Sequence, residues 1–235
     1  MTGLVALIGA GEFLPAMAEF DLGLLAATGR ARARVVIFPS ASFPDGEEVF
    51  QRWAAMGIEH FSALGAEVEP VLVRDRAAAD DAAHAQAIGE ADLVYLSGGR
   101  QDHLARVLDG SAVGQALTDA HERGAVIAGC SAGAMVLAER QFEFRRRLLP
   151  WPLRWRRGMA FVPGAAVIPH YDAWPEPLVA LMALQAPRGS AVLGIDEGTA
   201  IVGRDGSWQV HGRARVTIWH GRRRERFRSG EVFRL

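Results

Sequence analysis

Short apolar runs alternate with amphipathic segments along the first 130 residues of the chain. The apolar runs have the length of buried strands and cover residues 4–8, 34–38, 67–73, 93–96 and 125–128. The stretches between them carry apolar residues at helical spacing and predict helices over residues 15–27, 46–64, 77–88, 103–108 and 113–122. This alternation predicts an α/β fold: a mostly parallel, doubly wound sheet with helices on both faces.

The pattern changes after residue 140. Residues 142–157 predict an irregular excursion, in which aromatic residues and arginines alternate around two prolines. A further strand is expected over residues 165–168 and a helix over 177–184. Short β segments separated by turn residues then predict antiparallel hairpins added to the sheet edge near the C-terminus, at residues 191–195, 199–202, 208–210 and 215–219. Without a repeat or linker, we expect a single α/β domain over residues 1–235.

One turn carries the first candidate chemistry. Small residues surround a single hydroxyl in Gly129-Cys130-Ser131-Ala132-Gly133-Ala134, directly after the apolar run 125–128. A buried strand that turns abruptly into a helix tolerates little side-chain bulk, which is the Gly-x-Ser-x-Gly geometry of a nucleophile elbow. Ser131 would then lie at the C-terminal end of a strand, and the free N–H groups of the next helix would face an oxyanion. A tightly packed structural turn is the alternative.

Composition narrows the classes of function. The 235 residues are 50% hydrophobic and 23% charged, which is typical of a soluble globular protein, and the apolar runs are too short for a membrane helix. Because all 26 basic residues are arginine, a Walker lysine, a Schiff base and a Ser-Lys dyad are excluded. Cys130 is the only cysteine, so an intramolecular disulfide and a structural cysteine-based zinc site are excluded, and a cytoplasmic location is expected.

Arginine gathers in three clusters, at residues 145–147, 154–157 and 222–228. Nucleic-acid binding is one interpretation, but no helix-turn-helix, zinc-finger or aromatic ribonucleoprotein pattern accompanies the clusters, so we favour solvated arginines. The predicted partner is a small-molecule or peptide substrate, with no nucleic acid, no membrane, no cofactor and no metal. A homodimer stays open.

A serine hydroxyl is a weak nucleophile until a base removes its proton, and histidine suits that task near neutral pH. Of the seven histidines, only His170 follows a predicted strand on the elbow side of the sheet, so it is the candidate base. The oxyanion would need two donors, which the backbone N–H groups of Gly99 and Ala132 could supply. Cys130 is a rival nucleophile, but its place in the elbow directs it away from the mouth of the site.

Four segments, in chain order, carry a family resemblance: Gly98-Gly99-Arg100-Gln101, residues 129–134, Pro169-His170-Tyr171 and Gly194-Ile195-Asp196-Glu197-Gly198-Thr199-Ala200. They resemble the serine peptidases that include cyanophycinase and dipeptidase E, which have a class I glutamine amidotransferase-like fold. The resemblance implies a serine hydrolase that cleaves a small peptide or related amide through an acyl-enzyme on Ser131. It also implies substrate contact by Gln101, which could equally just begin its helix.

The chain departs from the family pattern at the triad acid. The resemblance implies an acidic residue between the elbow and the histidine, where this chain has only Glu139 and Glu143. Neither has the expected spacing; Glu143 is the predicted acid and Glu139 the alternative. A catalytically silent member that binds a ligand or partner is therefore a second hypothesis, and a glutamine amidase relying on Cys130 is a third.

The surroundings of the histidine also differ from those in cyanophycinase. That enzyme carries an acidic residue two positions before its histidine, and arginines after it that engage an aspartyl-arginine substrate. This chain has Ile168 in the first place, and acidic or aromatic residues follow His170. Hydrolysis of cyanophycin itself is therefore not expected.

Overall fold

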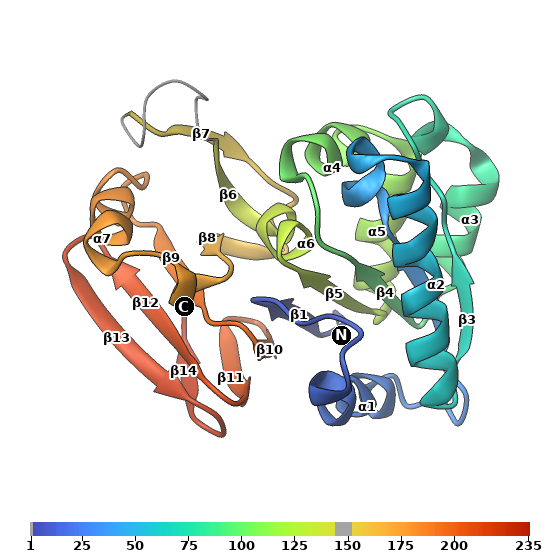
Figure 1. Ribbon diagram of the computed structural model, residues 1–235, viewed down its shortest axis with the longest axis horizontal. Coiled ribbons are helices and arrows are strands. Elements are labelled where there is room, and N and C mark those ends of the chain that lie inside the picture. The colour runs from blue at the N-terminus through green and yellow to red at the C-terminus, as the bar shows by residue number, and fades with distance from the viewer. Residues whose placement is uncertain (1, 144–151) are drawn as a thin grey trace.

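Two β-sheets and the helices around them form the protein (Figure 1). The structure is a computed structural model and describes residues 2–143 and 152–235. The strands are β1 (Val5–Ile8), β2 (Arg34–Phe38), β3 (Glu67–Pro70), β4 (Leu93–Leu96), β5 (Val126–Cys130), β6 (Ala138–Glu143), β7 (Arg154–Arg157), β8 (Val162–Ile168), β9 (Ala191–Ile195), β10 (Thr199–Arg204), β11 (Ser207–Gly212), β12 (Arg215–His220), β13 (Arg223–Arg228) and β14 (Val232–Arg234). The helices are α1 (Ala18–Ala27), α2 (Glu47–Ala63), α3 (Ala82–Glu90), α4 (Gln101–Leu108), α5 (Ala112–Arg123), α6 (Ala132–Leu137) and α7 (Glu176–Leu184), with short 3-10 helices η1 (Pro15–Met17), η2 (Ser40–Asp45), η3 (Ala78–Asp80) and η4 (Tyr171–Ala173).

The first sheet is the doubly wound one that the sequence predicts. Among the described residues its strand order is β14-β11-β10-β1-β5-β4-β2-β3, and β1, β5, β4, β2 and β3 run parallel. Alternate side chains of these strands enter two apolar cores. The core on one face includes residues of α1 and α2, and the core on the other includes residues of α3, α4, α5 and α6. Burial on both faces explains why the inner strands are continuously apolar.

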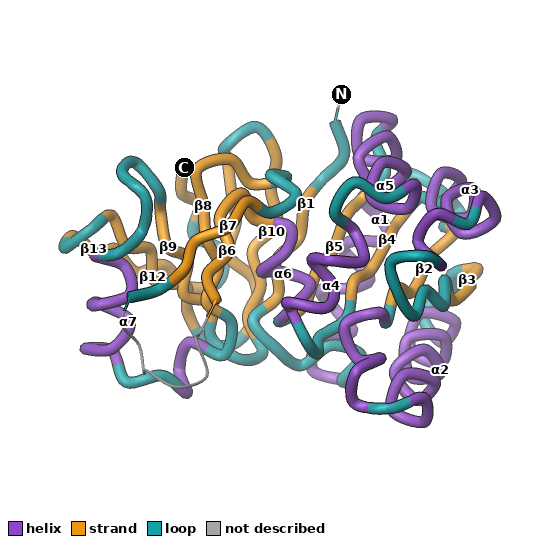
Figure 2. Tube along the Cα trace, turned by 90° about the horizontal axis from the view of Figure 1, so that it is seen from above, coloured by secondary structure: helices purple, strands orange, loops and turns teal. Residues whose placement is uncertain are grey.

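A second sheet was not expected from the sequence. Within the described ranges its order is β13-β12-β9-β8-β6-β7, and Figure 2 shows its strands apart from the half of the molecule that α2 and α3 occupy. One face joins the core that contains α6, and the other packs against α7. The predicted hairpin β10–β11 is confirmed. β12 also forms a hairpin, but its partner is β13, for which the sequence predicted no strand. The expectation that residues 191–195 and 199–202 extend one sheet is wrong, because β9 pairs with β8 while β10 pairs with β1.

The predicted excursion over residues 142–157 is wrong where the structure describes it, since β6 and β7 form an antiparallel pair there. Strands β13 and β14 lie in a stretch for which the sequence predicted no element. The apolar pattern failed because β7 and β13 are edge strands of the second sheet and expose most of their side chains. Edge strands that carry charge resist pairing with other chains.

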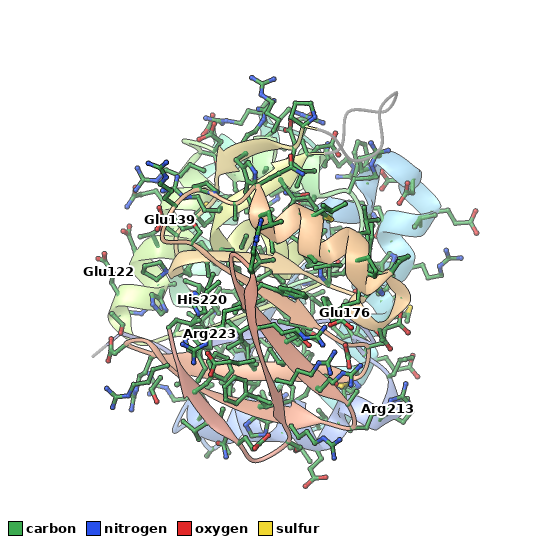
Figure 3. The ribbon with its side chains drawn as sticks, turned by 90° about the vertical axis from the view of Figure 1, so that its left-hand side faces the viewer. Glu122, Glu139, Glu176, Arg213, His220 and Arg223 are labelled. Atoms are coloured by element: carbon green, nitrogen blue, oxygen red, sulfur yellow. The ribbon has the colours of Figure 1, made fainter. Side chains whose placement is uncertain are left out.

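This edge position gives two arginine clusters a structural explanation. Arginines 154, 156 and 157 lie on β7, and arginines 223, 224, 226 and 228 lie on β13. Glu176 of α7 accepts hydrogen bonds from Arg226 at 2.8 and 3.0 Å and also pairs with Arg224, on the side of the molecule that Figure 3 shows. The cluster at residues 145–147 lies outside the described residues. The two described clusters are therefore consistent with solvated, edge-protecting arginines.

Candidate active site

Four strand ends converge at the site, two from each sheet. Ser131 directly follows β5, and Gly98 and Gly99 follow β4 in the same first sheet. His170 follows β8, and Glu197 follows β9 in the second sheet. The C-terminal ends of neighbouring parallel strands lie at the same edge of a sheet. The segments that follow β4 and β5 therefore lie side by side, as do those that follow β8 and β9.

Ser131 occupies a strained turn. Its φ of 50° and ψ of −110° are unusual for a residue with a side chain. The glycines around it leave no room for a Cβ: one on Gly129 would lie 2.5 Å from the carbonyl carbon of Gly133, and one on Gly133 would lie 2.3 Å from the carbonyl oxygen of Leu96. Strand β5, helix α6 and the end of β4 therefore approach as closely as a nucleophile elbow requires.

A continuous hydrogen-bonded chain links serine, histidine and carboxylate. Ser131 Oγ lies 3.0 Å from His170 Nε2, and His170 Nδ1 lies 2.7 Å from Glu197 Oε1. A carboxylate can only accept, so Nδ1–H donates to Glu197 and the neutral ring presents Nε2 as acceptor to the Ser131 hydroxyl. In this tautomer the imidazole is ready to take the serine proton.

The carboxylate at His170 is not the predicted one. Glu143 lies on β6 and pairs with Arg156 Nε on β7 at 2.5 Å, while Glu139 accepts a hydrogen bond from the N–H of Gly164 at 2.7 Å. Both side chains are bonded to residues of the second sheet, and neither contacts His170. The expectation that Glu143, or alternatively Glu139, orients His170 is therefore wrong. Glu197 follows a strand that the sequence predicts with the right bounds. The strand-end rule that selected His170 would have selected it too.

Packing fixes the histidine loop against β9. His170 has a left-handed backbone, with φ of 49° and ψ of 40°, immediately before η4. The ring of Tyr171 lies so close to Gly194 that a Cβ there would be 2.1 Å from Cδ2. The Tyr171 hydroxyl accepts a hydrogen bond from Trp219 Nε1 at 3.1 Å. The His170 loop therefore rests on the strand that delivers Glu197.

Two more carboxylates hold the segment that carries Glu197. The N–H of Glu197 donates to Asp172 Oδ1 at 3.0 Å, and the N–H of Arg215 donates to Asp196 Oδ2 at 3.3 Å. Burial, reinforced by the nearby Asp172, raises the pKa of Asp196. These contacts tie the crossover from β9 to β10 to the histidine loop on one side and to β12 on the other.

The Gly98-Gly99 turn approaches the elbow from β4. Gly99 has a φ of 137°, and a Cβ on it would lie 2.4 Å from the carbonyl oxygen of Ala41. On either side, Gly98 N–H donates to Glu12 Oε1 at 2.9 Å and Arg100 N–H donates to Ala41 O at 2.6 Å. Within the part of the chain that the structure describes, the N–H groups of Gly99 and Ala132 have no acceptor. Both remain available to a ligand.

Cys130 and Gln101 have defined protein partners. Cys130 is fully buried, its thiol donates to Glu12 Oε2 at 2.9 Å, and burial raises the thiol pKa well above its ordinary value. A buried, protonated thiol is a poor nucleophile, which disfavours the cysteine alternative. Gln101 begins α4, and its Nε2 donates to Gln141 Oε1 at 2.9 Å.

The described residues contain no group of three or more His, Cys, Asp or Glu side chains that could hold a metal ion. The absence of a metal from the reaction stays a prediction. Over residues 2–143 and 152–235, no helix is long and apolar enough to cross a bilayer.

A serine on a strand-to-helix elbow, in hydrogen-bond contact with a histidine that is itself bonded to a carboxylate, is the arrangement of the serine hydrolase class. The model of peptidase family S51 matches residues 5–211, and the chain belongs to this family. It is a peptidase.

The solved structures that are similar to this chain include two crystal structures. The crystal structure of a peptidase from an acI-B1 Actinobacterium has a TM-score of 0.89 and 31% identity, covering 100% of this chain and 98% of that one. The crystal structure of a putative peptidase E protein from Listeria monocytogenes EGD-e has a TM-score of 0.64 and 15% identity, covering 91% of this chain and 100% of that one, and shows the shared fold. No curated protein matches the chain.

Proposed function

We propose that the protein hydrolyses a small peptide or related amide through an acyl-enzyme on Ser131. The observation that carries the proposal is the chain of contacts from Ser131 through His170 to Glu197. Ser131 Oγ attacks the scissile carbonyl carbon as its proton passes to His170 Nε2. The C–N bond then breaks, and Nε2 returns the proton to the leaving amine. Water then attacks the acyl carbon while its proton passes to the same nitrogen; the C–Oγ bond breaks, the acid product leaves, and Nε2 returns the proton to Ser131 Oγ.

Glu197 takes the role of the triad acid in this mechanism. Its carboxylate accepts the Nδ1 proton of His170, holds the ring in the required tautomer and stabilises the imidazolium that forms during attack. The side chains of His170 and Glu197 are 39% and 47% exposed, so water and substrate can reach the relay. Glu143 has no part in the mechanism.

The N–H groups of Gly99 and Ala132 are proposed as the oxyanion donors. Both lack an acceptor among the described residues, and Ala132 is the first residue of α6, where the helix dipole favours negative charge. Gln101 is proposed as a substrate contact. Its Oε1 could accept from a substrate N–H while Nε2 stays bonded to Gln141.

Family membership supports peptide substrates, and the Listeria protein of similar fold is described as a putative peptidase E protein. The hypothesis of a catalytically silent member rests on the uncertain triad acid and on the arginine-rich excursion. The contact between Glu197 and His170, and the pairing of β6 with β7 in the described part of that excursion, weaken both grounds. The hypothesis of a glutamine amidase that uses Cys130 is disfavoured by the burial and raised pKa of the thiol.

Labelling with a fluorophosphonate probe, followed by intact-mass spectrometry, tests the proposal. One adduct is expected, on Ser131, and both Ser131→Ala and His170→Ala should abolish it. Glu197→Gln should slow labelling, whereas Glu143→Gln is the matched control and should leave the rate unchanged. Release of free amine from a dipeptide panel should follow the same order. An unlabelled Ser131, or equal effects of the two glutamate substitutions, would contradict the mechanism.

A further inference from the structure

Glu12 is a buried carboxylate beside the elbow that the mechanism does not use. It is 7% exposed and lies in the loop between β1 and η1. Its carboxylate accepts from the Gly98 N–H through Oε1 and from the Cys130 thiol through Oε2, each at 2.9 Å. Among the described residues no arginine or histidine forms an ion pair with it. Buried charges are normally paired, because losing hydration costs several kcal/mol.

The two hydrogen bonds of Glu12 join three segments that meet at the site. One goes to the Gly98-Gly99 turn after β4, and the other goes to the residue immediately before Ser131. A Cβ on Gly98 would lie 2.7 Å from Glu12 Oε1 and 3.2 Å from Ser131 Cβ. The carboxylate of Glu12 and the side chain of Ser131 therefore both lie close to the backbone of Gly98.

The Gly99 N–H lies between two anchored amides. The Gly98 N–H is held by Glu12 and the Arg100 N–H by the carbonyl of Ala41, at 2.9 and 2.6 Å. Gly99 itself has a positive φ, and glycine in such a turn has wide conformational freedom without external contacts. Because the N–H groups of Gly98 and Arg100 are both hydrogen-bonded, the Gly99 N–H between them is restricted to one orientation.

We propose that Glu12 is a positioning residue that sets the Gly99 N–H for the oxyanion, through its hydrogen bond to Gly98 N–H. This inference rests on the proposed function, because it assumes that an oxyanion forms on a substrate of Ser131. Glu12 does not touch the substrate. Positioning of the Gly98-Gly99 turn requires an acceptor oxygen at residue 12 for the Gly98 N–H, and it does not require a negative charge there.

This distinction makes Gln and Ala the informative substitutions. Glu12→Gln keeps an acceptor for Gly98 N–H and turns its amide toward the Cys130 sulfur, so the turn should keep its geometry. Glu12→Ala leaves the Gly98 N–H without its acceptor, and the turn can reorient. The matched control is Asp21→Ala, which truncates another buried carboxylate, bonded to His60 at 2.8 Å rather than to the glycine turn.

The test compares the second-order rate of Ser131 labelling by a fluorophosphonate, whose phosphoryl oxygen requires the same donors, with thermal melting. Glu12→Ala should slow labelling by about 10²-fold, the usual effect of losing one oxyanion donor. Glu12→Gln should stay within about threefold of the unmodified protein, since the hydrogen bond survives. Asp21→Ala should lower the melting temperature without changing the labelling rate. For peptide cleavage by Glu12→Ala, kcat should fall while KM changes little.

The outcomes separate this inference from the proposed function. If the unmodified protein is not labelled at Ser131, the proposed function fails. If it is labelled but Glu12→Ala, still folded by its melting curve, reacts at the same rate, the positioning role alone is overturned. Equal slowing by Glu12→Gln and Glu12→Ala would also overturn it, because the charge rather than the acceptor would then matter.

Discussion

Adding one methyl group at Gly194 should disable His170 without touching any reacting atom. Gly194 lies on β9, and the ring of Tyr171 packs directly against it. In Gly194→Ala the new Cβ would lie 2.1 Å from Cδ2, 2.5 Å from Cε2 and 2.6 Å from Cγ of that ring. Because real Cβ contacts are well above 3 Å, the ring must move by about 1 Å or more to reach van der Waals distance. His170 is the neighbouring residue and must respond.

The expected size of the effect follows from the packing. Overpacking a closed core costs about 1–3 kcal/mol. The shift also strains the hydrogen bond from Trp219 Nε1 to the Tyr171 hydroxyl, which adds about 1 kcal/mol if it breaks. For a domain of this size the melting temperature should fall by roughly 2–12 °C from overpacking alone. Displacement of His170 by about 1 Å should lower kcat about 10²-fold.

Thermal melting and the fluorophosphonate labelling rate measure the two effects in the same preparations. Gly23→Ala is the matched control: Gly23 lies in α1, a Cβ there meets nothing within 4 Å, and the substitution should stabilise the helix by about 0.5–1 kcal/mol without changing the labelling rate. If Gly194→Ala melts like the unmodified protein and is labelled within twofold of its rate, the packing argument is refuted.

Three further predictions concern titration, the thiol and the crossover. Burial lowers the pKa of three histidines, His103, His121 and His211. The unfolded chain therefore binds protons first, and the free energy of unfolding should fall as the pH drops just below about 6.5. Melting curves at pH 7.5 and 5.5 would show this fall, and a constant melting temperature would contradict it. Iodoacetamide should leave Cys130 unmodified in the folded protein and label it after denaturation, whereas native labelling with loss of activity would restore the cysteine hypothesis. Asp172→Ala should reduce kcat for peptide cleavage several-fold, because the Glu197 N–H loses its acceptor. Asp172→Asn keeps an acceptor oxygen and should retain most of the wild-type kcat in the same assay. Equal loss of kcat in both variants would refute the role of Asp172 in holding Glu197.

The elements that the sequence predicts well are those whose physics is local. Strands β2, β4 and β9 have the predicted bounds, because each is a continuous apolar run closed by a polar or glycine turn. The elbow was predictable because the close approach of β5 and α6 excludes side chains. Strand-end position also identified His170. These signals need only the chain's own periodicity and the rule that parallel strands end at one edge.

The parts that failed depend on which strands pair. Nothing local distinguishes β9 and β10 as members of different sheets, since only three residues separate them. The family resemblance implies an acid between Ser131 and His170 in chain order, whereas the carboxylate that contacts His170 in the structure belongs to Glu197, which comes after His170 in the chain. The arginine-rich strands β7 and β13 escaped prediction because an edge strand can be solvated along most of its length.

The division of the site between two sheets has a mechanical consequence. Ser131 and the Gly98-Gly99 turn belong to the first sheet, while His170 and Glu197 follow neighbouring strands of the second. Contacts within the second sheet, such as Tyr171 on Gly194, hold the histidine and its carboxylate as one unit. Only the 3.0 Å contact between Ser131 and His170 crosses the boundary within the relay. Under the proposed mechanism, relative displacement of the sheets would lengthen the serine–histidine contact first, and the packing of α6 between them would oppose that displacement.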